Sequence, residues 1–173
     1  DVEVPKQEVI LPRKTVMELQ RLLSDGDGAI EMQFANNQAK FVFEGMEFVT
    51  KLVEGKFPDY NRVIPRNHKN SITLGRAALL ATLQRTAILT SDKFKGVRLN
   101  LEPCTVRVAS NNAEQEEAVD ELDIDYQGDS IEIGFNVTYL IDALSNMSQD
   151  MVQLDLSDGN SSALFTIPGN PNF

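Results

Sequence analysis

The sequence of 173 residues contains one cysteine, one histidine and no tryptophan. A single cysteine excludes a disulfide framework and a cysteine-rich zinc site, and a single histidine disfavours a histidine-based catalytic or metal cluster. No run of about 18 apolar residues is present, so we expect no segment that spans a membrane. No secretory signal peptide is recognisable. We therefore expect a soluble intracellular protein, and the ends at Asp1 and Phe173 are typical of a piece of a longer chain.

Positive charge is also scarce. The chain has 16 lysines and arginines against 26 acidic residues, a formal charge of −10, and no basic residue follows Arg107. This balance disfavours a stand-alone nucleic-acid binder that relies on bulk positive charge. The acidic residues are densest between 114 and 125. That run is either a solvated face or a docking surface for a basic partner, and the sequence leaves both interpretations open.

An internal repeat organises the chain. Residues 8–23, 71–89 and 130–147 each contain a short alternating strand followed by an amphipathic helix, and they recur at intervals of roughly sixty residues. Alternating strands and turn signals follow each helix, with turns predicted at Asn36-Asn37 and at residues 157–160. The pattern predicts an α+β fold of repeated strand, helix and antiparallel meander units, with the helices on one face of the sheets.

Two strands and one boundary are predicted in more detail. Residues 8–12 should form the strand that precedes the first helix, and Leu122, Ile124 and Tyr126 should alternate along another strand. The segment from Phe57 to Pro65 is rich in turn formers, so we place a domain boundary near residue 66.

The sequence offers no recognisable catalytic site. His68 lies in a polar linker without metal-ligating neighbours, and Cys104 is a lone thiol beside Pro103. Asp123 and Asp125 alternate with apolar residues, which favours an outward strand face over a catalytic carboxylate pair. A glycine-rich phosphate loop is absent from the sequence. We therefore expect no catalytic residue, no metal site, no cofactor and no enzymatic activity.

Four blocks carry a family resemblance, and they occur in order across nearly the whole chain: residues 51–60, 93–99, 111–118 and 133–139. Together they resemble signatures of the bacterial sliding clamp, the beta subunit of DNA polymerase III. The resemblance implies a DNA-clamp fold in which each domain holds two of the repeated units. Residues 1–65 would be the second half of the middle domain, and residues 66–173 the third domain without its last strand and tail.

The resemblance also implies a function. A clamp of this family is a homodimeric ring that encircles double-stranded DNA without sequence preference. It acts as a processivity factor in DNA replication, in the bacterial cytoplasm at the nucleoid, and it catalyses no reaction. Short linear peptides of the replicative polymerase, the clamp loader and repair factors bind an apolar pocket between the middle and third domains. The residues that match this pocket are Pro58, Arg62, Val63, Phe94, Asn136, Tyr139, Asn160 and Ser162.

Asn160 stands where the family often has an aliphatic residue, which puts one pocket wall in question.

Two further sets of residues follow from the resemblance. Basic residues on the first two helices would face the DNA: Arg13, Lys14, Arg21, Arg76 and Arg85. Apolar and acidic residues would meet the neighbouring subunit: Ile88, Leu89, Glu114, Glu116 and Glu117.

Two other hypotheses stay open at this point. An acidic α+β scaffold could bind a basic partner through residues 114–125, and such binding would collapse with salt. An enzyme on the same fold would need titratable groups with shifted pKa values, and the sequence offers no candidate base other than carboxylates.

Overall fold

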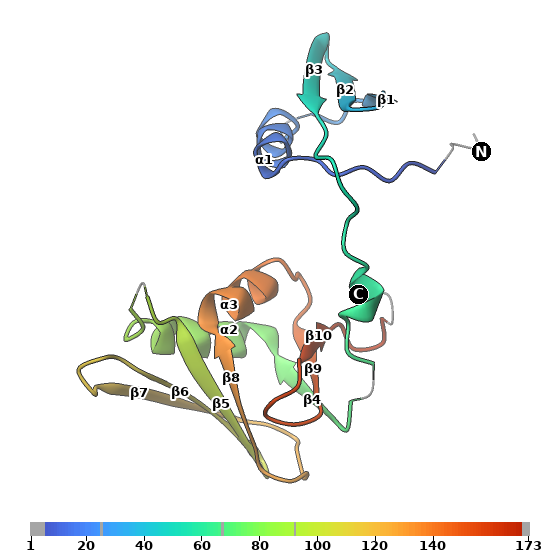
Figure 1. Cartoon of the computed structure of the whole chain (residues 1–173). Coiled ribbons are helices and arrows are strands. Elements are labelled where there is room, and N and C mark those ends of the chain that lie inside the picture. Colours follow the sequence, from blue (N-terminus) through green and yellow to red (C-terminus); the bar gives the residue numbers. More distant parts are fainter. Residues whose placement is uncertain (1–5, 25, 67, 92, 171–173) are drawn as a thin grey trace. The chain divides into compact units, whose positions relative to one another are not determined.

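The computed structural model describes residues 6–24, 26–66, 68–91 and 93–170. It divides into two compact units, Asp1–Tyr60 and Asn61–Phe173. The first unit is blue to teal in Figure 1, and the second runs from green to red. Each unit has its own hydrophobic core.

The first unit is one helix on a three-stranded antiparallel sheet. Apolar side chains that alternate along the middle strand, Ala39, Phe41 and Phe43, are buried against Leu19 of the helix. The predicted turn at residues 36–37 separates the first two strands, so the predicted helix and hairpin are confirmed. The elements are helix α1 (Arg13–Leu22) and strands β1 (Glu31–Phe34), β2 (Gln38–Phe43) and β3 (Met46–Lys51), in the sheet order β1-β2-β3.

The second unit contains two repeats of the predicted pattern. A short 3-10 helix at Tyr60–Arg62 precedes the first of them. The first repeat consists of β4 (Asn70–Gly75), α2 (Arg76–Ala87), β5 (Gly96–Glu102), β6 (Thr105–Asn111) and β7 (Glu117–Asp123). The second repeat consists of β8 (Ile131–Asn136), α3 (Val137–Ser145), β9 (Met151–Leu156) and β10 (Leu164–Thr166).

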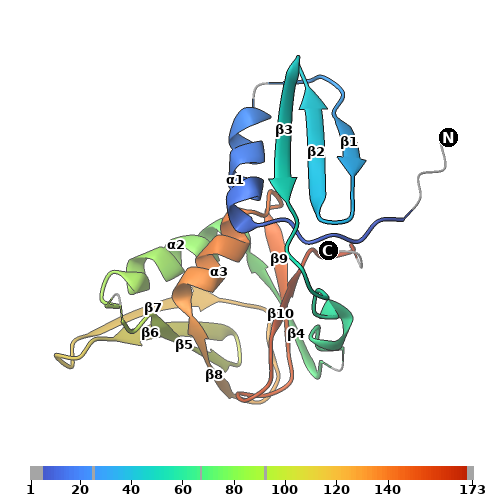
Figure 2. The same ribbon diagram turned by 45° about the horizontal axis from the view of Figure 1, so that its top comes forward.

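The two repeats exchange strands. The strand before each helix pairs with the first strand after the other helix, which gives the sheets β7-β6-β5-β8 and β10-β9-β4. The first amide of each helix is bound in the same crosswise way: Arg76 donates to the Asp150 carbonyl and Val137 donates to the Lys95 carbonyl, both at 2.8 Å. Helices α2 and α3 pack side by side (Figure 2). One continuous core of leucine, isoleucine and valine therefore joins both repeats.

The strand predicted at residues 8–12 is wrong. The structure describes this segment as extended chain outside any ladder, held by a 2.9 Å hydrogen bond from the Val53 amide to the Ile10 carbonyl. In the second unit, the strand before a helix pairs only with the other repeat. The first unit has one repeat, so its described residues offer no strand from a second repeat to pair with this segment.

The predicted strand through Leu122, Ile124 and Tyr126 is shorter than expected, because β7 ends at Asp123. Its partner β6 begins at Thr105, directly after the turn at Cys104, whose φ is +67°. Ile124 and Tyr126 nevertheless stay buried. The alternation of buried and exposed residues is therefore correct, although the ladder stops earlier.

Candidate functional site

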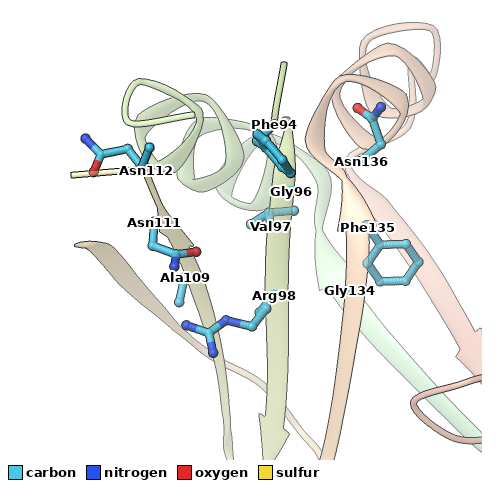
Figure 3. A pocket seen from close by; sticks show the side chains of 11 residues that line it. Phe94, Gly96, Val97, Arg98, Ala109, Asn111, Asn112, Gly134, Phe135 and Asn136 are labelled. Carbon is cyan, nitrogen blue, oxygen red and sulfur yellow. The ribbon is translucent and has the colours of Figure 1, made fainter. Parts of the chain in front are cut away.

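A cleft of about 600 Å³ opens on the sheet of β5, β6 and β8 (Figure 3). Its floor contains the small residues Gly96, Ala109 and Gly134. Arg98 pairs with both Ala109 and Gly134 in the ladders, so these positions lie side by side. Val97, between Gly96 and Arg98, is buried on the opposite, core-facing side. Because glycine has no side chain, the outer face of the sheet is hollowed here.

Two residues of the predicted partner pocket, Phe94 and Asn136, line this cleft (Figure 3). The Phe94 amide donates to the hydroxyl of Ser91 at 3.0 Å, which fixes the turn before β5 and leaves the ring 75% exposed. Asn136 is the N-cap of α3, and its Oδ1 accepts a hydrogen bond from the Thr138 amide at 3.0 Å. Asparagine is a favourable N-cap because it satisfies a free amide of the first turn. The structure therefore brings an apolar ring and a fixed amide to one cleft.

The polar wall of the cleft was not predicted from the sequence. It contains Arg98, Asn111 and Asn112, and the Arg98 guanidinium lies 3.5 Å from a carboxylate oxygen of Glu117. The signal that could have indicated the cleft is the pair of glycines, Gly96 and Gly134, in otherwise well-formed strands. Glycine inside a strand often marks a place where a ligand or another backbone approaches closely.

The other predicted pocket residues are exposed but do not line this cleft. Val63 and Tyr139 are 71% and 73% exposed, which is unusual for large side chains with apolar surface. Asn160 and Ser162 lie in the loop between β9 and β10. Arg62 lies in the second unit, whereas Pro58 belongs to the first. The gathering of these residues into one pocket stays a prediction.

Asp158 organises the loop that carries Asn160 and Ser162. Its Oδ1 accepts hydrogen bonds from the amides of Asn160 and Ser161, both at 2.9 Å, and from the Ser161 hydroxyl at 2.8 Å. These bonds, the Asn160 amide first, lower the pKa of the Asp158 carboxyl. A Cβ at Gly159 would overlap the backbone carbonyl oxygen of Glu132, so glycine is required where the loop meets β8.

We expect the amide resonances of Asn160 and Ser161 to titrate together at a pH below the usual aspartate range. The pKa of Asp158 is lowered in the folded chain, so its ionised form stabilises the loop at neutral pH. This stabilisation is lost as the pH falls through the folded-state pKa. A pH series of amide NMR spectra measures the inflection, and Asp158→Asn should abolish it. Amides that do not respond to pH, or that respond equally in Asp158→Asn, would contradict this account.

Three of the five basic residues that were predicted to face DNA form ion pairs or hydrogen bonds with other groups of this chain. Arg21 pairs with Glu18 at 2.9 Å, and the Arg85 Nε donates to Asp120 at 2.8 Å. Arg76 donates to the carbonyls of Gln149 and Leu144, at 2.8 and 3.2 Å, and so ties the start of α2 to the end of α3. The remaining two, Arg13 and Lys14, are the exposed first residues of α1.

The residues predicted to meet a neighbouring subunit lie on two exposed segments. Ile88, 79% exposed, follows α2, and Leu89 beside it is half-buried. Glu114 and Glu116 lie in the loop between β6 and β7, where the Asn112 Oδ1 accepts both of their amides at 3.0 Å. Glu117 opens β7, which is an edge strand of its sheet. Asn112 therefore shapes an acidic loop, a role that sequence reasoning missed.

The described part of the chain contains neither a candidate metal-binding cluster nor a candidate membrane-spanning helix. No group of histidine, cysteine and acidic side chains there is arranged to hold a metal ion. None of the helices in that part is long and apolar enough to cross a membrane. Cys104 is exposed in the turn between β5 and β6, where the Gln127 side chain donates to its sulfur at 3.2 Å.

Two family models match the chain consecutively. Residues 1–59 match the central domain of the DNA polymerase III beta subunit, and residues 61–173 match its C-terminal domain. The beta sliding clamp of Pseudomonas putida is 44% identical over 165 residues, which cover 95% of this chain and 45% of that protein. The chain thus spans less than half the length of the curated relatives it matches.

Solved structures agree in fold. The DNA polymerase III beta subunit of Pseudomonas aeruginosa aligns with a TM-score of 0.89 at 42% identity, covering 96% of this chain and 46% of that one. A sliding clamp from the same organism, solved bound to griselimycin, aligns with a TM-score of 0.88 at 41% identity, covering 99% of this chain and 47% of that one. The α+β clamp fold predicted from the repeat and the resemblance is confirmed.

Proposed function

Because this chain belongs to the family of the DNA polymerase III beta subunit, the bacterial sliding clamp, we propose that it is part of a ring that holds replication proteins on DNA. The observation that carries the proposal is the consecutive match of two clamp domains along residues 1–59 and 61–173. The first unit then corresponds to the second half of the middle domain, and the second unit to the third domain. The ring acts at the nucleoid in the bacterial cytoplasm and catalyses no reaction.

The DNA contact in this proposal is weak and non-specific. A sliding contact has to reach the phosphates without locking onto bases, so a few basic side chains on the helices are sufficient. Arg13 and Lys14 at the start of α1 are the strongest candidates, because Arg21, Arg76 and Arg85 already bind groups of this chain. Topology rather than affinity would retain the DNA, which reconciles this function with a net charge of −10.

The partner contact in this proposal is an apolar peptide site on the second unit. Val63, Phe94 and Tyr139 are each more than two-thirds exposed, and exposed aromatic and aliphatic side chains of this kind serve as anchors for partner peptides. Arg62, Asn136 and Ser162 supply polar groups that could bind a peptide backbone. A related clamp has been solved with griselimycin bound, which supports a ligand site on this fold.

The subunit contact in this proposal uses the segment after α2 and the loop between β6 and β7. Ile88 and Leu89 supply apolar surface, and the loop of Glu114, Glu116 and Glu117 supplies negative charge for bases of a neighbouring subunit. In the ring, these acidic residues would therefore help to join two subunits. The alternative function, an acidic scaffold unrelated to clamps, is not favoured, because the relatives and the family models are clamps throughout.

A peptide titration tests the proposal. We expect a short linear peptide with hydrophobic residues to shift the backbone amides around Val63, Phe94 and Tyr139 in NMR spectra of the isotope-labelled chain. The control peptide has its apolar residues replaced by serine and should cause no shift. Binding should weaken little with salt, because the anchors are apolar. Shifts confined to residues 114–125, and lost in high salt, would overturn the proposal in favour of the acidic scaffold.

A further inference from the structure

The cleft on the second unit opens where two neighbouring strands separate. Strand β5 pairs with β8 as far as its first residue, Gly96, and β6 pairs with β7 as far as its last residue, Asn111. The ladder between β5 and β6, however, ends at the pair of Arg98 and Ala109. Both strands continue beyond this last pair, and residues on either side of the gap line the cleft (Figure 3). The cleft therefore includes a fork between β5 and β6.

The fork leaves main-chain groups of both strands outside the ladder. The Lys95 carbonyl accepts a hydrogen bond from the first amide of α3, and the Asn112 amide donates to the Glu116 carbonyl. Because main-chain groups alternate in direction along an antiparallel strand, those of Gly96 point away from β8, and those of Asn111 point away from β7. Both sets face the fork, where no ladder pair joins the two residues. An extended peptide can bind such groups as it does at the edge of a sheet.

The floor of the fork has room for a side chain of a bound peptide. A Cβ atom at Gly96 or Gly134 would meet no atom within 4 Å outside the adjacent residues, so the space above both glycines is open. The Phe94 ring, 75% exposed, lies at the same opening (Figure 3). Since Phe94 and Asn136 also belong to the proposed peptide site, the fork is continuous with that site.

Positive charge gathers on the β5 side of the fork. Lys93 and Lys95 are exposed, and neither forms an ion pair with another residue that the structure describes. The Arg98 side chain extends from β5 toward β6 (Figure 3) and lies 3.5 Å from a carboxylate oxygen of Glu117, with both side chains about half exposed. A guanidinium has several N–H donors in a planar fork, so this single contact leaves donors for a second carboxylate.

We propose that the fork binds an acidic segment that flanks the apolar peptide of a partner protein, with a carboxylate on Arg98 and the main chain of the segment on Gly96 and Asn111. This inference rests on the proposed function, because the apolar peptide brings the segment to the fork. The acidic loop after β6 repels a carboxylate on that side, so the charge contact is confined to the β5 side. Partners with the same apolar residues would then differ in affinity according to the charge of the residues that flank them.

Fluorescence anisotropy of labelled peptides tests the proposal on the 173-residue chain. The anchor peptide is the hydrophobic peptide of the titration above, and its extended forms carry a short run of aspartate, serine or lysine at one end or the other. We expect aspartate at one of the two ends to lower the dissociation constant about tenfold relative to serine at low salt. This gain should shrink as salt rises, and lysine should give none. The amides of Gly96 and Asn111 should shift more with the aspartate form than with the anchor peptide alone.

Three variants locate the gain at the fork. Arg98→Gln should remove the advantage of aspartate over serine. Arg107→Gln is the matched control and should keep it, because Arg107 lies on the same sheet face, pairs with Glu121 at 2.8 Å and does not line the cleft. Gly134→Val fills the floor of the fork and should remove the advantage. Its folding should persist, because the space above Gly134 is open and valine is favourable in strands.

The outcomes separate this inference from the proposed function. Equal affinities for the aspartate and serine forms, with the anchor peptide still bound, would overturn the inference and leave the proposed function intact. An advantage of aspartate that survives Arg98→Gln and Gly134→Val but is lost in Arg107→Gln would place the acidic segment elsewhere on the sheet and overturn the inference as well. A chain that binds none of the peptides would overturn both.

Discussion

Replacing Leu83 by alanine should lower the free energy of unfolding of the second unit by about 3–5 kcal/mol. Leu83 is fully buried on α2 within the core that joins both repeats. The substitution removes three carbon atoms and leaves a cavity that two sheets and two helices cannot easily fill, because the exchanged strands hold them in place. Urea unfolding followed by circular dichroism measures the loss as a lower midpoint at an unchanged slope.

Ile88→Ala is the matched control for this prediction. Ile88 lies just beyond the end of the same helix but is 79% exposed, so its truncation should change the free energy of unfolding by less than about 0.5 kcal/mol. A loss of under about 1 kcal/mol for Leu83→Ala would contradict the buried position of this face of α2. Equal losses for the two variants would show that burial does not separate these positions.

Tyr139→Ala should weaken binding of a clamp-binding peptide by about thirtyfold, which corresponds to roughly 2 kcal/mol. The side chain lies in the first turn of α3 and is 73% exposed. Its truncation should therefore not disturb the helix, which Val137, Leu140 and Leu144 anchor in the core. An aromatic ring that becomes buried on binding loses its whole contact area when truncated. Fluorescence anisotropy of a labelled peptide measures the change in dissociation constant.

Val119→Ala serves as the control for the binding measurement. Val119 is another exposed apolar residue of the second unit, on the edge strand β7, outside the proposed peptide site. Its truncation should leave the affinity unchanged. If Tyr139→Ala bound the peptide as tightly as the unaltered chain, Tyr139 would have to be removed from the peptide site. An unchanged unfolding midpoint would show that any loss of binding is local.

The helices and hairpins were predictable because their signals are local. The apolar spacing that begins at Val16 and Val137 and the asparagine turn at residues 36–37 act within a few residues. Strand pairing is different, because it depends on which segments meet. Residues 8–12 have the alternation of a strand, yet their partner in this fold would come from another repeat. Sequence periodicity indicates that a segment can pair, but it does not supply the partner.

The candidate site likewise combines residues that were predicted from the sequence with a feature that depends on distant segments and was missed. Phe94 and Asn136 were found through a family resemblance, and the structure places both at one cleft. The hollow beneath them was missed, because it arises only when Gly96, Ala109 and Gly134 come together from three different strands. The hydrogen bonds from Arg76 to backbone carbonyls could not be predicted from the sequence for a similar reason. Its carbonyl acceptor at Gln149 lies 73 residues away in the sequence.

The strand exchange has a consequence for synthesis of the protein. Ser71 on β4 pairs with Asp155 on β9, 84 residues later. A chain that leaves the ribosome from its amino terminus must therefore keep β4 unpaired until nearly the whole second unit has been made. Contacts between such distant segments slow folding, because the intervening chain must first be ordered. During that interval the open strand edges are exposed to neighbouring nascent chains, so this domain should depend on chaperones more than a domain built from hairpins alone.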